Sequence, residues 1–171
     1  MKTTKPKSAL DICNLALGKL HHQPIKSINP NGDKAQYLCY LHYHQCRRDI
    51  LAMNRWPFAS STATADELEP MEYEGKMVRK VPDDCIRVSS VLDDEGNEIQ
   101  LGDWKLRGRA IITDKKLGSI VYIKDIEDVE KFSEYFIEAL ACRLAAKLCI
   151  PLLIRERASL KDVVGTKKML D

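Results

Sequence analysis

The repeat of apolar residues along the chain changes twice, and this change limits the folds that the sequence can adopt. Residues 8–57 and 128–171 carry apolar residues three and four positions apart, the spacing of one face of an α-helix. Residues 58–124 lose that spacing and contain short runs in which apolar and polar residues alternate, as in a β-strand. The sequence therefore predicts helices in the first and last thirds of the chain and β-structure in the middle.

The first predicted helix begins after Ser8, a residue type that caps helices, with Asp11 three residues later as an acidic capping partner. Its apolar stripe ends near Leu20. Residues 21–32 contain two prolines and an Asn-Gly pair, which is typical of a loop.

The second predicted helix is capped by Asp33 and ends before Pro57, because a proline disfavours the α conformation of the residue before it. Helical spacing returns at Val129 and runs to Pro151, which is expected to break the helix. A fourth, amphipathic helix is predicted over residues 152–170.

The middle segment is expected to form a small antiparallel sheet. Residues 85–92 alternate as a strand, residues 93–97 form a turn, and residues 98–101 are predicted as the returning strand. No clear element is expected over residues 60–80. Three more short strands are predicted at residues 104–106, 110–113 and 119–124.

Together these elements predict a mainly α-helical α+β protein, a four-helix bundle with a small antiparallel sheet inserted between its second and third helices. The length of 171 residues suggests one domain over residues 1–171. The bundle would comprise residues 8–57 and 128–171, and the β-rich insert residues 58–124.

Charge and hydropathy argue against two classes of protein. The 27 basic and 25 acidic residues give a net charge of +2, whereas a dedicated DNA-binding protein usually has a strong basic excess. No run of about 18 uncharged apolar residues occurs, so no membrane contact is expected. The six cysteines form no CxxC pair and follow no signal peptide, so we expect reduced core thiols in a cytosolic compartment during synthesis.

No pattern in the sequence predicts catalysis, a metal or a cofactor. Cys39, His42 and Cys46 share one side of a helix, but the two cysteines also belong to its apolar stripe, and we favour core thiols beside a surface histidine. His21 and His22 are adjacent in a loop, where solvated side chains are favoured. Acidic pairs occur in turn-like segments, where carboxylates are usually solvated, at Asp83-Asp84, Asp93-Asp94-Glu95 and Glu127-Asp128.

Several residues are candidates for contacts with other molecules. Trp56 lies at the end of the second helix, where it either pins the helix or anchors an interface. Arg47, Arg48 and Arg55 either form a solvated face or a salt bridge between subunits, or face nucleic acid. The same question applies to the C-terminal segment, with interface candidates Arg155, Arg157, Leu160, Lys161, Lys167 and Lys168.

Several blocks in this order resemble the head-to-tail adaptors of tailed bacteriophages, of the tail accessory factor or tail tubular protein A type. They are LDICNLALGKL, then DKAQYLCYLHYHQCRRDILAMNRWPFA, then VPDDCIRVSSVLDDEGN, WKLRGRAIITD and IVYIKDIEDVEKFSEYFIEALACRLAAKLCIPL. The resemblance covers residues 8–153.

The resemblance implies a structural virion protein without enzymatic activity. Such adaptors bind the portal protein as a ring, typically of twelve copies, extend the DNA channel, help to retain the packaged DNA and present a platform for the tail nozzle. Residues 152–171 would contact the portal, and residues 93–97 would lie on an outer or tail-facing surface. Two other classes stay open: a cell-wall-degrading virion enzyme, and a small nucleic-acid-binding protein that uses Arg47, Arg48 and Arg55.

Overall fold

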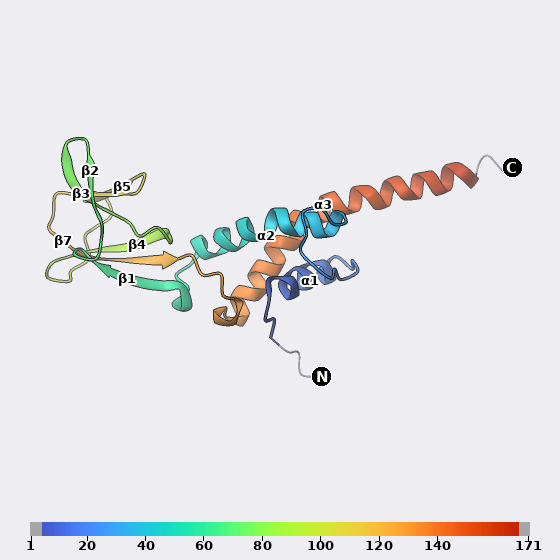
Figure 1. The fold of residues 1–171 in the computed structure, drawn as a ribbon, viewed down its shortest axis with the longest axis horizontal. Helices are drawn as coiled ribbons and strands as arrows, with labels where there is room; N and C mark the ends of the chain where they lie inside the picture. Colours follow the sequence, from blue (N-terminus) through green and yellow to red (C-terminus); the bar gives the residue numbers. More distant parts are fainter. Residues whose placement is uncertain (1–4, 168–171) are drawn as a thin grey trace. The chain divides into compact units, whose positions relative to one another are not determined.

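The computed structural model describes the backbone of residues 5–167 and the side chains of residues 5–153. The chain divides into two compact units (Figure 1). We call residues 1–50 with 128–171 the helical unit and residues 51–127 the β-rich unit. Three α-helices occur in the described part of the chain: α1 (Ala9–Lys19), α2 (Lys34–Met53) and α3 (Glu134–Lys167).

The N-terminal cap of α1 is confirmed. The hydroxyl of Ser8 accepts a hydrogen bond from the Asp11 N–H at 3.1 Å, and the Asp11 carboxylate accepts from the N–H groups of Ser8 and Lys7. This reciprocal box satisfies backbone donors that a helix leaves unpaired at its first turn. The predicted end near Leu20 is also confirmed, because Leu20 is the C-terminal cap.

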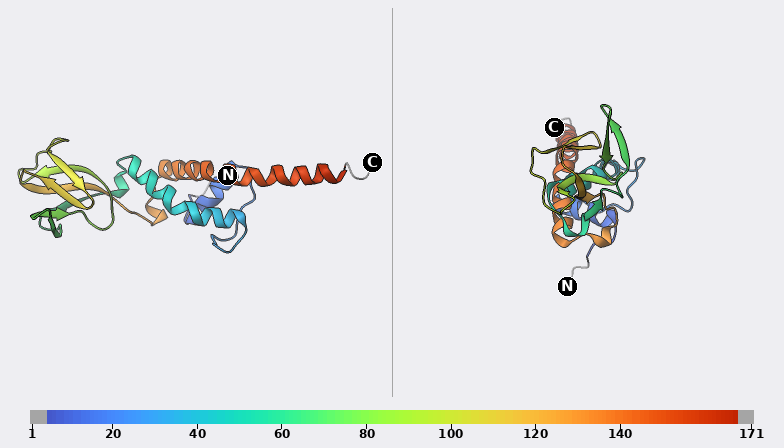
Figure 2. Two further views of the ribbon diagram at one scale, coloured as in Figure 1. Left: turned by 90° about the horizontal axis from the view of Figure 1, so that it is seen from above. Right: turned by 90° about the vertical axis from the view of Figure 1, so that its left-hand side faces the viewer.

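In the helical unit, α1 and α2 lie beside the first half of α3 (Figure 2). The contact surfaces are apolar, and polar contacts border them. Lys19 of α1 pairs with Glu138 of α3, and Arg143 of α3 pairs with Asp49 of α2 at 3.2 Å. The fully buried residues at the centre of this core include Ile12, Leu17, Phe132, Phe136, Leu140, Leu144 and Leu148.

The predicted four-helix bundle is wrong, because residues on both sides of Pro151 belong to the same helix, α3. A proline removes one backbone N–H from the ladder and crowds the preceding turn, at a cost of about 3 kcal/mol in a helix interior. That cost is local, and the helical residues on either side keep their own hydrogen bonds. The ammonium group of Lys34 in α2 donates to the Pro151 carbonyl. The short turn Val129–Lys131, a 3-10 helix, precedes α3.

The β-rich unit contains two antiparallel sheets rather than one small insert. A short 3-10 turn, Pro57–Ala59, leads into β1. The three-stranded sheet has the order β1-β7-β4 and the four-stranded sheet the order β2-β3-β6-β5. Seven strands occur among the described residues: β1 (Ser60–Thr64), β2 (Pro70–Tyr73), β3 (Lys76–Lys80), β4 (Cys85–Asp93), β5 (Trp104–Arg107), β6 (Ala110–Thr113) and β7 (Leu117–Lys124).

Residues 60–80, where no element was predicted, contain β1, β2 and β3. A two-residue turn joins β2 to β3, with positive φ angles at Glu74 (48°) and Gly75 (75°), a backbone geometry that suits tight hairpins. These strands are short and largely exposed, so they lack the apolar alternation that marks a half-buried strand.

The predicted strand over residues 98–101 is also wrong, because only an isolated bridge between Leu92 and Glu98 forms there. The strand predictions for residues 85–92, 104–106, 110–113 and 119–124 are confirmed by β4, β5, β6 and β7. The apolar core of this unit brings side chains from both sheets together, including Val91, Ile111, Ile120 and Tyr122.

Candidate functional site

The thiols that could have bound a metal are part of the helical core. Cys39 and Cys46 are fully buried on α2, whereas His42 is half-buried and His44 is exposed, with its ring 5.5 Å from that of Tyr43. Among residues whose side chains are described, no group of three or more His, Cys, Asp or Glu side chains could hold a metal ion.

Cys13 of α1 lies against Cys39 of α2 in this core. The hydrogen bond with Cys39 and burial raise the pKa of the Cys13 thiol, and burial raises that of Cys46. Since the thiolate is the reactive form of cysteine, these two groups are held in the unreactive neutral state. Their arrangement fits packing rather than nucleophilic chemistry.

The first acidic pair singled out in the sequence, Asp83-Asp84, makes ion pairs at the surface of the β-rich unit. Asp83 contacts Lys80 at 3.2 Å and Arg109 at 3.1 Å, and Asp84 contacts Lys124 at 3.0 Å.

The second acidic run, at the turn after β4, is bonded in the same way. Asp93 accepts from the N–H groups of Glu95 and Asn97, which closes the turn. Asp94 pairs with Lys116 at 2.8 Å, and this hydrogen bond lowers the pKa of Asp94. A general acid in a glycosidase needs the opposite shift, a carboxyl pKa raised by burial.

The interface candidates from the sequence are not gathered on one surface. Arg47 is buried, with 1% of its surface exposed, whereas Arg48 is exposed on the same helix. Trp56 is half-buried, with its ring 6.1 Å from that of Phe58. Arg55 donates to the Ser89 carbonyl and the Ser90 hydroxyl, both at 2.8 Å. The side chains of Arg155, Arg157, Leu160, Lys161, Lys167 and Lys168 lie outside the described residues.

A second stripe on α2, which we call the α2 stripe, faces away from the core. It consists of Tyr37, Tyr40, Leu41 and His44, at the spacing that puts side chains on one helix face. The two tyrosines are 45% and 50% exposed and Leu41 is 50% exposed. Sequence analysis missed this surface because it assigned a single apolar stripe to the helix. The signal was present in the spacing of the ring residues themselves, because Tyr40 and His44 follow Tyr37 at three and seven positions.

The β-rich unit presents two sheet edges with opposite charge. Glu69, Glu72 and Glu74 are exposed along and beside β2, which is one edge of the four-stranded sheet. Lys105 and Arg107 are exposed on β5, the other edge.

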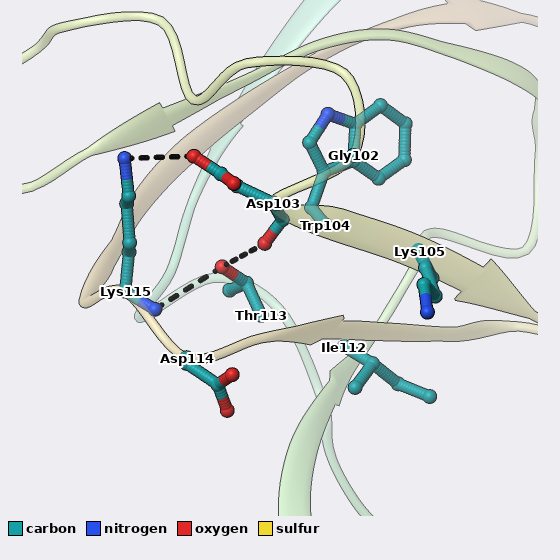
Figure 3. A pocket seen from close by; sticks show the side chains of 8 residues that line it. All are labelled: Gly102, Asp103, Trp104, Lys105, Ile112, Thr113, Asp114 and Lys115. Atoms are coloured by element: carbon teal, nitrogen blue, oxygen red, sulfur yellow. Dashed lines mark hydrogen bonds and ion pairs between the residues drawn. The ribbon is translucent and has the colours of Figure 1, made fainter.

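A groove of about 280 Å³ lies along β5 and β6 (Figure 3). Its polar groups bond to one another: Lys115 pairs with Asp103 at 3.0 Å, and the Thr113 hydroxyl donates to the Asp103 carbonyl at 3.0 Å. The Trp104 ring stands on one face of β5, and Lys105 points to the other. The groove therefore holds an aromatic side chain and a closed polar network, not a set of convergent free groups.

No family model matches the sequence, and no curated protein matches it. Within the described part of the chain, no helix combines the length and the apolar composition needed to cross a bilayer.

Proposed function

We propose that this chain is a structural virion protein of a tailed bacteriophage, a head-to-tail adaptor without enzymatic activity. In this proposal copies of the chain form a ring, of twelve by analogy with the family it resembles, between the portal protein and the tail nozzle. The ring extends the channel for the packaged DNA and helps to retain it. The protein would be found in the virion, and in the host cytoplasm during assembly.

The observation that carries the proposal is the α2 stripe. Tyr37, Tyr40 and Leu41 are each about half exposed on one face of a helix whose opposite face is in the core. Exposed apolar side chains that gather on one face mark surfaces for other proteins, and tyrosine is enriched at the centres of such surfaces. A subunit packed between neighbours and a portal needs surfaces of this kind.

The length of α3 supports the part of the proposal that concerns the portal. The helix continues through Pro151 to Lys167, so residues 152–171, the segment proposed to contact the portal, begin in continuous helix. A helix rises about 1.5 Å per residue, so its 34 residues extend about 50 Å. Ile150 and Leu153 are 68% and 51% exposed where this segment begins, and they offer apolar surface for a partner.

The direct test is to mix the full chain with rings of the portal protein from the same genome and to image the mixture by electron microscopy. We expect a discrete extra layer on the portal and co-sedimentation of the two proteins. A mixture that never co-sediments over a range of protein and salt concentrations would contradict the proposal.

Two variants test whether the α2 stripe contributes to the layer that forms on the portal. Tyr40→Ser with Leu41→Ser should weaken or abolish the layer, since it removes the exposed apolar surface without touching the core. The control is Leu15→Ser, an exposed leucine on α1 (42% exposed), which should leave the layer intact. If the double variant and the control form the layer equally well, the α2 stripe is not part of the interface.

A further inference from the structure

The four-stranded sheet of the β-rich unit ends in two strands with opposite charge. We propose that neighbouring copies join through this sheet, with β2 of one copy pairing with β5 of the next. The inference rests on the proposed ring, and it names the surface through which neighbours in that ring meet. Within the described residues, no strand pairs with the outer side of β2 or of β5. A free sheet edge presents backbone N–H and C=O groups that can pair with another strand.

The hydrogen bonds between β2 and β3 show which backbone N–H and C=O groups of β2 point to the free side of the sheet. The Lys80 N–H donates to the Glu69 carbonyl at 2.9 Å, so Glu69 bonds toward β3. In an antiparallel pair the bonding direction alternates along the strand. Pro70 and Glu72 therefore point to the free side. The outward groups are the Pro70 carbonyl and both backbone groups of Glu72.

The outward backbone groups of β5 follow from the hairpin that it forms with β6. The two-residue turn Gly108-Arg109, with φ 57° at Gly108, joins Arg107 to Ala110. A two-residue turn closes on a hydrogen-bonded pair, so Arg107 and Lys105 bond toward β6. The backbone N–H and C=O groups of Trp104 and Leu106 then point to the free side of the sheet.

The even number of strands makes the two edges compatible. All neighbours in this sheet are antiparallel, so β2 and β5 run in opposite directions. A second copy in the same orientation therefore places its β2 antiparallel to β5 of the first copy. The outward residues of both edges also have their side chains on the same face of the sheet, as the register of the four strands requires.

We assign the register that uses the most outward groups, with Glu72 of one copy opposite Trp104 of the next. The Glu72 and Trp104 N–H groups each donate to the carbonyl of the other residue. Pro70 then lies opposite Leu106, whose N–H donates to the Pro70 carbonyl. Three hydrogen bonds form, and the missing N–H of Pro70 leaves only one position of the ladder without a donor.

The same register pairs opposite charges across the join. Glu69 lies opposite Arg107, which has no ion-pair partner in the described part of the chain. Lys105 also has none there, so the β5 edge carries two cations without an ion-pair partner on the face that bears Glu69, whose partner within its own copy is Lys80 at 2.8 Å. Two β2 edges would bring carboxylates together, and two β5 edges would bring cations together. Charge thus favours the head-to-tail contact, the kind of contact from which a closed ring is built, over a two-fold dimer.

Exposed ion pairs and a few strand hydrogen bonds contribute little individually, so free copies should associate weakly. Copies held side by side on a portal experience a high effective concentration, which populates the contact. The test therefore traps the contact chemically instead of relying on its affinity.

In the first experiment, equal amounts of ¹⁴N- and ¹⁵N-labelled full-length protein are mixed at high concentration and treated with a water-soluble carbodiimide. This reagent joins a carboxylate to an amine that it contacts. We expect links from Glu69 to Lys105, whose side chains lie on the same face in this register, and these links should contain both isotopes, which identifies them as links between copies. The pair Glu69 and Lys80, 2.8 Å apart within one copy, should give links of a single isotope and serves as the internal control. Absence of mixed-isotope links to Lys105 overturns the proposal.

Charge reversal provides the second experiment, with oligomers measured by sedimentation velocity. Glu69→Lys with Glu72→Lys should reduce self-association, and Lys105→Glu with Arg107→Glu should reduce it equally. All four substitutions in one chain should restore it, because the two edges are again complementary. Lys26→Glu with Lys147→Glu, at exposed sites of the helical unit, changes the net charge as the basic-edge variant does and should have no effect. Circular dichroism establishes that each variant is folded.

The outcomes separate this inference from the proposed function. If the basic-edge variant adds a layer to the portal as the unaltered chain does, the edge contact is wrong and the adaptor function stands. If the unaltered chain never binds the portal but forms the mixed-isotope links, the edge contact stands and the adaptor function is wrong.

Discussion

The side-chain amide of Asn14 in α1 forms two hydrogen bonds with the backbone of Ile25, which lies in the loop between α1 and α2. Its nitrogen donates to the Ile25 carbonyl at 3.1 Å, and its oxygen accepts from the Ile25 N–H at 2.8 Å. Ile25 is 6% exposed, so its backbone groups are shielded from water and depend on this amide. One side chain thereby fixes the course of the loop.

Removal of this amide should destabilise the helical unit. We expect Asn14→Ala to lower the free energy of unfolding by about 1–3 kcal/mol, because it leaves a buried donor and acceptor without partners. Urea unfolding followed by circular dichroism measures the change. Gln45→Ala, which removes an exposed hydrogen bond to Asp49, is the control and should change stability by less than about 0.5 kcal/mol. Equal effects of the two variants would contradict the role given to Asn14.

The capping box of α1 should make stability depend on pH. Hydrogen bonds from the Lys7 N–H and from Ser8 hold the pKa of Asp11 below its ordinary value of 3.8. A carboxyl whose pKa is lower in the folded state stabilises the fold above the unfolded pKa. This contribution is lost as the pH falls below 3.8 and through the lower folded-state pKa. Because Asp11 is exposed, we expect a small effect.

The variant Asp11→Asn isolates that contribution. It should be less stable than the unaltered chain at neutral pH, and the difference should shrink as the pH falls below 3.8. Thermal unfolding across this pH range is the measurement. A difference that stays constant with pH would assign the effect to helix propensity rather than to the ionised carboxylate.

Two glycines should respond in opposite ways to the same substitution. A β-carbon at Gly118 in β7 would overlap the backbone carbonyl of Asp93, at the irregularity in the pairing of β4 with β7. We expect Gly118→Ala to destabilise the protein by about 2–3 kcal/mol, since backbone must move. Gly18 in α1 has open space around it, so Gly18→Ala should stabilise the helix by about 0.5 kcal/mol. The urea unfolding midpoint should fall in Gly118→Ala and rise in Gly18→Ala, relative to the unaltered chain.

Because α3 is continuous through Pro151, replacement of this proline should increase the stability of the protein. Pro151→Ala restores a backbone N–H inside a helix, so the helical signal at 222 nm should be kept or increased, and stability should rise by about 1–3 kcal/mol. Pro57→Ala is the control, because Pro57 occupies the first position of a short turn, where no N–H is needed. Equal stabilities of Pro151→Ala and the unaltered chain would mean that Pro151, like Pro57, stands where no backbone N–H is needed, as at the start of a separate helix.

Four of the six thiols should fall into two groups in their reaction with a thiol reagent. Cys142 is exposed on α3 and should react first in the folded protein, whereas Cys13, Cys39 and Cys46 should react only on unfolding. Burial and the raised pKa values of Cys13 and Cys46 both slow the reaction, because only an accessible thiolate attacks. In Cys142→Ser the fast phase should disappear. Rapid reaction of four or more thiols in the native state would contradict the packing of α1 against α2.

The sequence by itself determined those elements whose signal is local. The Ser8 and Asp11 cap, the loop after Leu20 and the alternating strand at β4 were all predicted, because capping, turn residues and side-chain periodicity act over a few neighbouring positions.

Only the tertiary structure decided the remaining features, because they depend on contacts between distant positions. Pro151 is a local signal to end a helix, yet α3 continues through it and contacts Lys34 of α2. The exposed strands β2 and β3 lack an apolar alternation, and their pairing with the rest of the sheet places them. The second stripe of α2 is visible only once the first is known to be buried. Periodicity reports which residues share a face, but packing decides which face is covered.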